Sequence, residues 1–86
     1  MEIFYTARFK REYRKVPKTI QLKAKKKEAI FLKDPFAITL KTHKLHGELA
    51  GMWAFSVDYS YRIIFEFENN NSEATFYFID NHDIYR

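Results

Sequence analysis

The hydrophobic pattern of this chain changes its period once, near Pro35, and that change limits the folds open to it. Before Pro35 the apolar residues recur every three or four positions, which is the spacing of an amphipathic helix. After Pro35 they alternate, which is the spacing of a strand with one buried face. Helices grouped before a run of strands are typical of an α+β domain with both helices on one face of a sheet.

The helical part divides into two segments at Pro17, because proline cannot continue a helix. Glu2–Tyr5 predicts a short strand ahead of them, and Thr6 predicts the N-cap of a helix over residues 7–16. Ile20–Lys33 predicts a second helix, so that the pair forms an αα-hairpin. We expect Ile20, Ala24 and Phe31 to form its buried stripe, beside Leu22, Ala29 and Leu32.

The second part predicts strands over Trp53–Asp58, Tyr61–Glu68 and Ala74–Asp80, with a hairpin turn at residues 69–72. Arg62 lies on the less apolar face of the middle strand. The last strand is apolar on both faces, so we expect it to be central. The predicted fold is an N-terminal αα-hairpin packed on a twisted, mainly antiparallel sheet of four or five strands.

Size and composition predict one domain, residues 1–86, because 86 residues leave no room for a second core. The chain has no cysteine, which excludes disulfides and thiolate metal sites. Its three histidines match no usual zinc spacing, so we expect neither a metal nor a cofactor. No N-terminal apolar run resembles a signal peptide, and no apolar run is long enough for a membrane span. We therefore expect a cytoplasmic protein.

The formal net charge is +4, and the positive charge is concentrated near the N-terminus. The block carries Arg8, Lys10, Arg11, Arg14, Lys15, Lys18, Lys23, Lys25, Lys26 and Lys27, with Glu12 as its only acid. Such a block favours an acidic partner, either a nucleic acid or an acidic protein. The alternative is a solvated helix face.

Histidines and fixed cations are concentrated between Lys41 and Arg62, and His82 follows at the C-terminus. Histidine is the side chain whose ordinary pKa lies nearest neutrality, so it exchanges protons at working pH. Arginine remains cationic and binds two phosphate oxygens at once. Together they favour a site that binds a phosphodiester and moves protons around it, which is the chemistry of RNA cleavage.

Three strings carry a resemblance to a known family. They are L-H-G-E-L-A-G-M-W from Leu45 to Trp53, Y-R-I-I-F from Tyr61 to Phe65, and F-I-D-N-H-D-I-Y from Phe78 to Tyr85. In this order, behind a helix hairpin, they resemble the RelE/ParE superfamily of bacterial toxins. The resemblance implies the toxin of a type II toxin–antitoxin system.

The two branches of that superfamily imply different activities. Members of the RelE branch are mRNA interferases, endoribonucleases that often cut in the ribosomal A site. Members of the ParE branch share the fold but act on DNA gyrase. The expected function is mRNA cleavage by metal-independent attack of a 2′-OH, with a cognate antitoxin, mRNA and the ribosome as partners. The alternatives are a ParE-like non-nuclease toxin and an inactive antitoxin-binding relative.

The resemblance to YoeB-like and YafQ-like members implies four catalytic residues. Arg62 would stabilise charge on the scissile phosphate, and His43 would be the general base. His82 would be the general acid, and Tyr85 would stack on a base or support proton transfer. Each has a structural alternative, and for Arg62 it is an ion pair with Glu66 or Asp80.

Lys41, Lys44 and His46 are predicted to contact RNA phosphates along the same rim. The chain also departs from the family pattern. RelE-type members place two lysines where this chain has Trp53 and Phe55, so a lysine pair cannot perform its acid–base chemistry.

Overall fold

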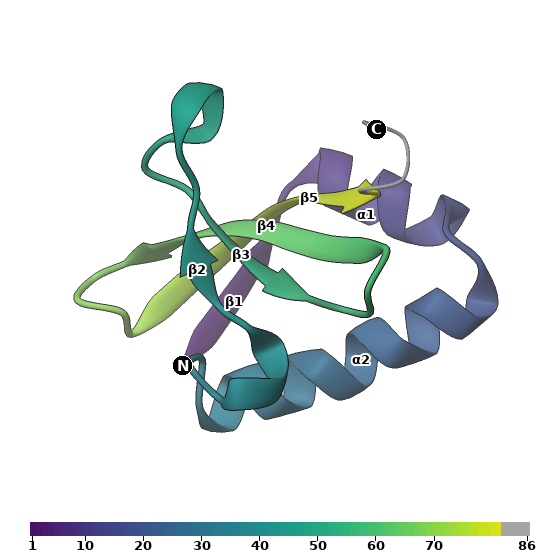
Figure 1. The fold of residues 1–86 in the computed structure, drawn as a ribbon, viewed down its shortest axis with the longest axis horizontal. Coiled ribbons are helices and arrows are strands. Elements are labelled where there is room, and N and C mark those ends of the chain that lie inside the picture. The colour runs from purple at the N-terminus through teal and green to yellow at the C-terminus, as the bar shows by residue number, and fades with distance from the viewer. Residues whose placement is uncertain (82–86) are drawn as a thin grey trace.

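The computed structural model describes residues 1–81, which form two helices and a five-stranded sheet (Figure 1). The helices are α1 (Ala7–Lys15) and α2 (Lys18–Lys33). The strands are β1 (Glu2–Tyr5), β2 (His43–Lys44), β3 (Trp53–Ser56), β4 (Tyr61–Glu68) and β5 (Glu73–Asn81). Short 3₁₀ turns over Ile38–Leu40 and Gly47–Leu49 lie between α2 and β3.

The helices begin close to their predicted positions. Thr6 is the N-cap of α1, and its Oγ1 accepts a hydrogen bond from the amide of Phe9 at 3.0 Å. This bond satisfies one of the amides that the first turn of a helix leaves unpaired. Pro17 separates the helices and is the N-cap of α2, which begins at Lys18 rather than at the predicted Ile20.

The sheet has the strand order β1-β5-β4-β3-β2. β1 runs parallel to β5, and every other neighbouring pair is antiparallel. The prediction of a central last strand is confirmed, because β5 lies between β1 and β4. The turn between β4 and β5 uses Asn69, Asn70 and Asn71, which have positive φ angles of 52°, 56° and 66°. The expected fold class is therefore confirmed.

Both helices pack on one face of the sheet, as predicted, and bury an aromatic core there. Phe31 of α2 is fully buried, and its ring centroid lies 5.0 Å from those of Phe55 and Phe65 and 5.5 Å from that of Phe76. Aromatic side chains bury a large area each, which suits a domain of this size.

The opposite face carries a smaller cluster, which leaves part of the sheet open. Its buried residues are Leu45, Ala54 and Ile64, and Leu49, Met52 and Phe78 pack against them. The loop between β2 and β3 supplies three of these side chains and lies at the top of Figure 1, away from α2 at the bottom. The cluster ends short of Arg62 on the same face of β4.

The expected buried stripe of α2 is confirmed, and the residues beside it are exposed. Ile20, Ala24 and Phe31 are buried, whereas Leu22 and Leu32 are 55% and 46% exposed and Ala29 is also exposed. The helix touches the sheet along one narrow line, so residues beside that line remain at the surface.

The strand predicted over Trp53–Asp58 ends earlier, at Ser56. Asp58 lies instead in the turn, where its Oδ1 accepts hydrogen bonds from the amides of Ser60 and Tyr61 at 2.9 Å each. This use of its own side chain ends the pairing with β4, as is typical of aspartate in turns.

Candidate functional site

Arg62 and Asp80 form the centre of the candidate site, on the sheet face that the helices do not cover. They are direct partners in the register of β4 and β5, and therefore point to the same face. A cleft of about 320 Å³ opens beside them. Its lining residues are Arg8, Glu48, Leu49, Arg62, Phe78 and Asp80.

The guanidinium of Arg62 is fixed by a carboxylate. Its Nε donates to Asp80 Oδ2 at 2.8 Å, and the two side chains are 21% and 8% exposed. Because only Nε is used within residues 1–81, the terminal nitrogens of Arg62 remain able to bind an anion in the cleft. The ion-pair alternative for Arg62 is thus present, in an arrangement that also suits phosphate binding.

His43 lies on β2 with its side chain exposed. It is paired with Ala54 of β3, which is paired with Ile64 of β4, so His43 shares a face with Arg62. Two strand spacings and two residues of rise separate His43 from Arg62, or roughly 12 Å between Cα atoms.

The hydrogen bond of His43 fixes which ring nitrogen is basic. Nδ1 lies 2.8 Å from the carbonyl oxygen of Lys41. A carbonyl can only accept, so Nδ1 carries the proton and donates it. In the neutral ring Nε2 is then the nitrogen with a lone pair, as a general base requires.

The three predicted RNA contacts do not lie together. Lys44 is paired with Trp53, and its Nζ lies 5.5 Å from the centre of the Trp53 ring, on the other face of the sheet from Arg62. Lys41 and His46 are exposed at the two ends of β2. The two other catalytic candidates, His82 and Tyr85, lie outside the described residues and remain predictions.

Two lining residues of the cleft were not singled out from the sequence, Arg8 and Glu48. Arg8 belongs to the basic block of α1, where the sequence gives no reason to prefer one cation over another. The available signal is Glu12, the only acid of that block, which stands four residues after Arg8 and faces it on a helix. No sequence spacing indicated that Glu48 would line the cleft.

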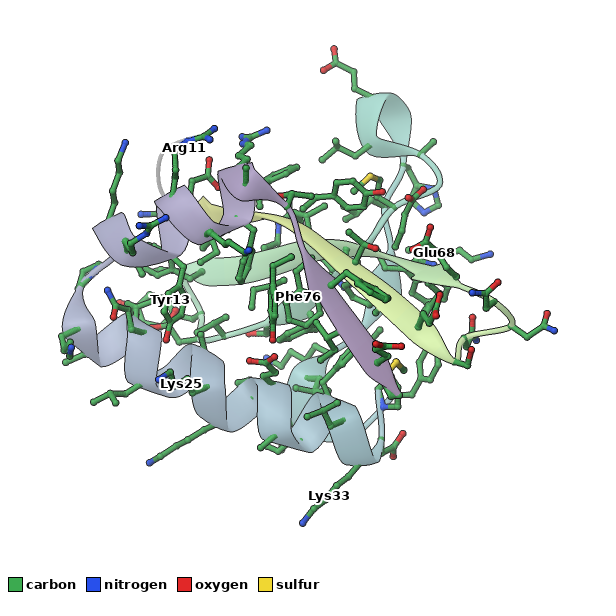
Figure 2. All side chains as sticks on the ribbon, turned by 180° about the vertical axis from the view of Figure 1, so that it is seen from behind. Arg11, Tyr13, Lys25, Lys33, Glu68 and Phe76 are labelled. Carbon is green, nitrogen blue, oxygen red and sulfur yellow. The ribbon has the colours of Figure 1, made fainter. Side chains whose placement is uncertain are left out.

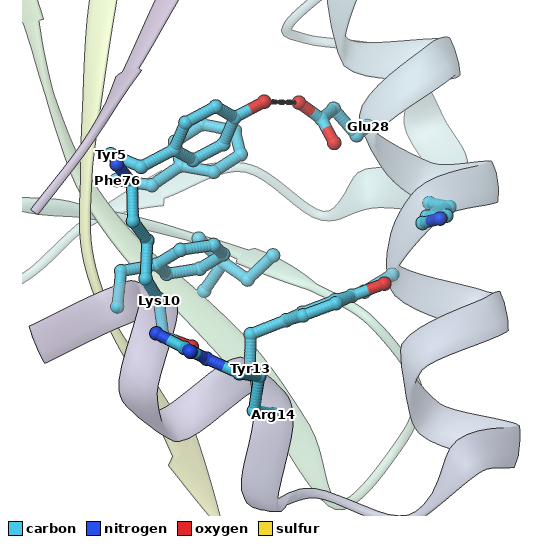
Figure 3. A pocket seen from close by; sticks show the side chains of 10 residues that line it. Tyr5, Lys10, Tyr13, Arg14, Glu28 and Phe76 are labelled. Carbon is cyan, nitrogen blue, oxygen red and sulfur yellow. Dashed lines mark hydrogen bonds between the residues drawn. The ribbon is translucent and has the colours of Figure 1, made fainter. Parts of the chain in front are cut away.

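A second cavity, of about 440 Å³, lies between the two helices and the sheet (Figure 3). Its lining includes the aromatic rings of Tyr5, Phe9, Tyr13 and Phe76. Tyr5 donates a hydrogen bond to Glu28 across it. Burial, followed by this bond, raises the pKa of Tyr5 above its ordinary value, so Tyr5 remains neutral at working pH. Lys10, Arg14 and Lys25 also line it.

Within residues 1–81, no three His, Cys, Asp or Glu side chains are grouped as metal ligands would be. The same part of the chain contains no helix with the length and apolar character that crossing a membrane requires.

No family model and no curated protein matches the sequence. Solved structures do match. A YoeB/ParE toxin from Agrobacterium tumefaciens has a TM-score of 0.78 at 18% identity, covering 95% of this chain and 99% of that one. YafQ from E. coli has a TM-score of 0.78 at 16% identity, covering 98% and 96%.

The RelBE2 toxin–antitoxin complex from Mycobacterium tuberculosis provides a third match. Its TM-score is 0.70 at 21% identity, covering 93% of this chain and 95% of that one. The matches span nearly the whole of each chain, so the resemblance to the RelE/ParE superfamily is confirmed as a likeness of fold.

Proposed function

We propose that this chain, which has the fold of the RelE/ParE toxins, is the toxin of a type II toxin–antitoxin system and cleaves mRNA. The observation that carries the proposal is the guanidinium of Arg62, fixed by Asp80 at 2.8 Å beside an open cleft. A fixed cation in a partly dry site stabilises the charge that gathers on phosphate in the transition state. A ParE-like toxin acting on gyrase has no need of such a group.

The proposed reaction is a transphosphorylation. His43 Nε2 takes the proton from a ribose 2′-OH, and the 2′-oxygen attacks the adjacent phosphorus. The bond to the 5′-oxygen breaks, and that oxygen receives a proton from His82. The products are a 2′,3′-cyclic phosphate and a 5′-OH, with Arg62 neutralising the phosphoryl oxygens throughout. Tyr85 stacks on a base or supports proton transfer.

The remaining predicted contacts position the RNA. In this proposal Lys41 and His46, which are exposed on either side of β2, contact RNA phosphates. Lys44 lies against Trp53 and contributes net charge instead. The net charge of +4 favours association with mRNA and the ribosome in the cytoplasm.

The proposed protein partner is a cognate antitoxin, in a hetero-oligomer. The matching chain of RelBE2, which has a similar fold, was solved in a toxin–antitoxin complex. The basic helices of this chain favour an acidic antitoxin segment, by charge complementarity.

The experiment is induced expression in growing bacteria without an antitoxin, with transcript 5′ ends mapped by primer extension. Wild type is compared with Arg62→Ala and His82→Ala. Arg11→Ala is the matched control, because Arg11 is an exposed arginine that extends outward from α1 (Figure 2). The expected result is new 5′ ends within translated frames that persist in the control and vanish in the two site variants.

Other outcomes point to the competing classes. Growth arrest with intact transcripts and with full toxicity of His82→Ala would support a gyrase-directed toxin. Harmless overexpression would support an inactive antitoxin-binding relative. Cleavage by the purified protein should survive a chelator, and a strict requirement for Mg²⁺ would contradict the proposed mechanism.

A further inference from the structure

Helix α1 takes the place of a strand along part of the edge of β5. β1 pairs with β5 only as far as Phe76. Beyond it, Thr6 Oγ1 donates to the carbonyl oxygen of Tyr77 at 2.7 Å, and Glu12 Oε1 accepts from the amide of Ile79 at 3.0 Å. The carboxylate of Glu12 therefore satisfies a backbone group that a neighbouring strand would otherwise satisfy.

The second oxygen of Glu12 holds Arg8. Oε2 accepts from Arg8 Nε at 2.9 Å, and the guanidinium carbon of Arg8 lies 4.1 Å from the centre of the Phe78 ring. Phe78 belongs to the cluster on the face of Arg62, opposite the aromatic core. The attachment of α1 to the edge of β5 thus brings Arg8 around to the face that carries the candidate site.

Arg8 and Arg62 line the same cleft and are bound in the same manner. Each uses Nε for a carboxylate, Glu12 for one and Asp80 for the other. Within residues 1–81 the terminal nitrogens of both guanidiniums make no hydrogen bond, so each can receive a phosphate oxygen. Two fixed guanidiniums around one cleft suit a ligand with consecutive phosphates.

We propose that Arg8 forms a second phosphate subsite, which binds a phosphate of the same RNA strand next to the one at Arg62, and that Glu12 is the positioning residue of that subsite. This inference rests on the proposed function, because it takes RNA as the ligand of the cleft. It adds a contact from α1 to a site otherwise formed by the sheet and its loops.

The same contacts could also be an ordinary surface ion pair with no role in binding. Arg8 is 56% exposed, and exposed pairs four residues apart on a helix contribute little to stability. In this chain, however, the carboxylate of Glu12 also accepts a hydrogen bond from the amide of Ile79, which restricts its position. The guanidinium of Arg8 also lies over the Phe78 ring, so the Arg8 side chain loses less conformational freedom when a phosphate binds.

The test uses binding to a fluorescein-labelled single-stranded RNA with 2′-O-methyl riboses, which cannot be cleaved, followed by fluorescence anisotropy. Arg8→Ala should weaken binding about tenfold at low salt, the usual effect of losing one charge-assisted contact. The slope of log affinity against log salt should fall by about 0.7, the value for one phosphate on a single strand. Arg11→Ala, which removes the same charge from the same helix, should change affinity less than about twofold.

Glu12→Gln separates positioning from net charge. The amide oxygen of glutamine can still accept from Ile79, so α1 remains attached, but the hold on Arg8 is lost. If Glu12 were merely a negative charge near the cleft, removing it would tighten RNA binding. A positioning role predicts the opposite sign, roughly a two- to threefold weaker binding despite the extra positive charge.

The outcomes distinguish the inference from its premise. Equal affinities for Arg8→Ala and Arg11→Ala, or tighter binding by Glu12→Gln, would overturn the subsite while the proposed cleavage stands. Wild-type binding without cleavage of cellular transcripts would overturn the nuclease, and the Arg8 series would still decide the subsite. Wild type that does not bind this RNA would overturn the subsite, while new transcript 5′ ends in cells would still support the nuclease. Circular dichroism of each variant confirms that it is folded.

Discussion

Arg62 and Asp80 are cross-strand partners whose side chains meet at 2.8 Å on the open face of the sheet, and Asp80 is the more buried of the two. A largely buried ion pair contributes little by its mere presence, but removing one partner leaves an uncompensated charge. A change to either residue should therefore alter both the charge of the site and the stability of the β4–β5 hairpin.

Replacing the acid of this pair should lower both the stability of the fold and the rate of RNA cleavage. Asp80→Ala is expected to lower the free energy of unfolding by about 3 kcal/mol, since Arg62 is then left partly buried without a partner. Arg62 should also lose its fixed orientation, so that RNA cleavage falls even though the net charge rises. A double-mutant cycle with Arg62→Ala, followed by urea unfolding, measures the coupling, and independent effects of the two changes would contradict the pairing.

Asp58 should make the protein sensitive to acid. Burial acts to raise its pKa, but the amides of Tyr61 and Ser60, followed by the charge of Lys23, outweigh burial, and the pKa lies below its usual range. A carboxylate with a lowered pKa stabilises the fold above the unfolded value, about 3.9, and loses this effect as the pH falls through the folded value.

The matching experiment compares wild type with Asp58→Asn by urea unfolding at pH 7 and at pH 3. At pH 7 the variant should be less stable. At pH 3 the difference should shrink, because this pH lies below the unfolded pKa of about 3.9, where the unfolded chain binds a proton that the folded Asp58 carboxylate resists. A difference that stays constant between the two pH values would argue against the ionised form of Asp58.

Tyr5 should have its effect at the opposite end of the pH scale. Its pKa is raised by burial, followed by the hydrogen bond to Glu28 (Figure 3). A group with a raised folded pKa contributes its stability below the unfolded value, about 10 for tyrosine, and loses it as the pH rises toward the folded value. Between pH 10 and 12 the wild type should therefore lose stability more steeply than Tyr5→Phe. Parallel pH profiles of thermal unfolding would contradict this assignment.

The aromatic core should depend on one side chain of α2. Phe31 is fully buried and contacts rings from three strands, so Phe31→Ala is expected to cost about 3–5 kcal/mol. Leu22→Ala on the same helix is the control, because Leu22 is 55% exposed and should change stability by less than about 0.5 kcal/mol. Urea unfolding measures both changes, and similar costs for the two would contradict the burial of Phe31 in the core.

The sequence predicted those features that neighbouring residues determine. Pro17 separates the helices, Thr6 caps the first, and three consecutive asparagines form the β4–β5 turn. The open face of β4 followed from alternation, and Arg62 lies on it as expected. In each case the relevant force acts within a few residues along the chain.

Some features that depend on distant partners were not predicted. The two-residue strand at His43 is too short to produce an alternating pattern, and its existence depends on pairing with β3. Arg8 reaches the cleft only because Glu12 bonds to the amide of Ile79, which lies far along the chain.

The parallel pairing of β1 with β5 has a consequence for the order of folding. Among residues 1–81 the first strand pairs with the last, since Glu2 of β1 aligns with Glu73 of β5. At about 5–20 residues per second, β1 waits roughly 4–14 s for its partner during translation. Asp80 also belongs to β5, so the cation-holding site and the closed sheet form together. A nascent chain that is halted after β4 has neither the closed sheet nor the carboxylate that holds Arg62. The assembled cleft therefore exists only after β5 has been synthesised.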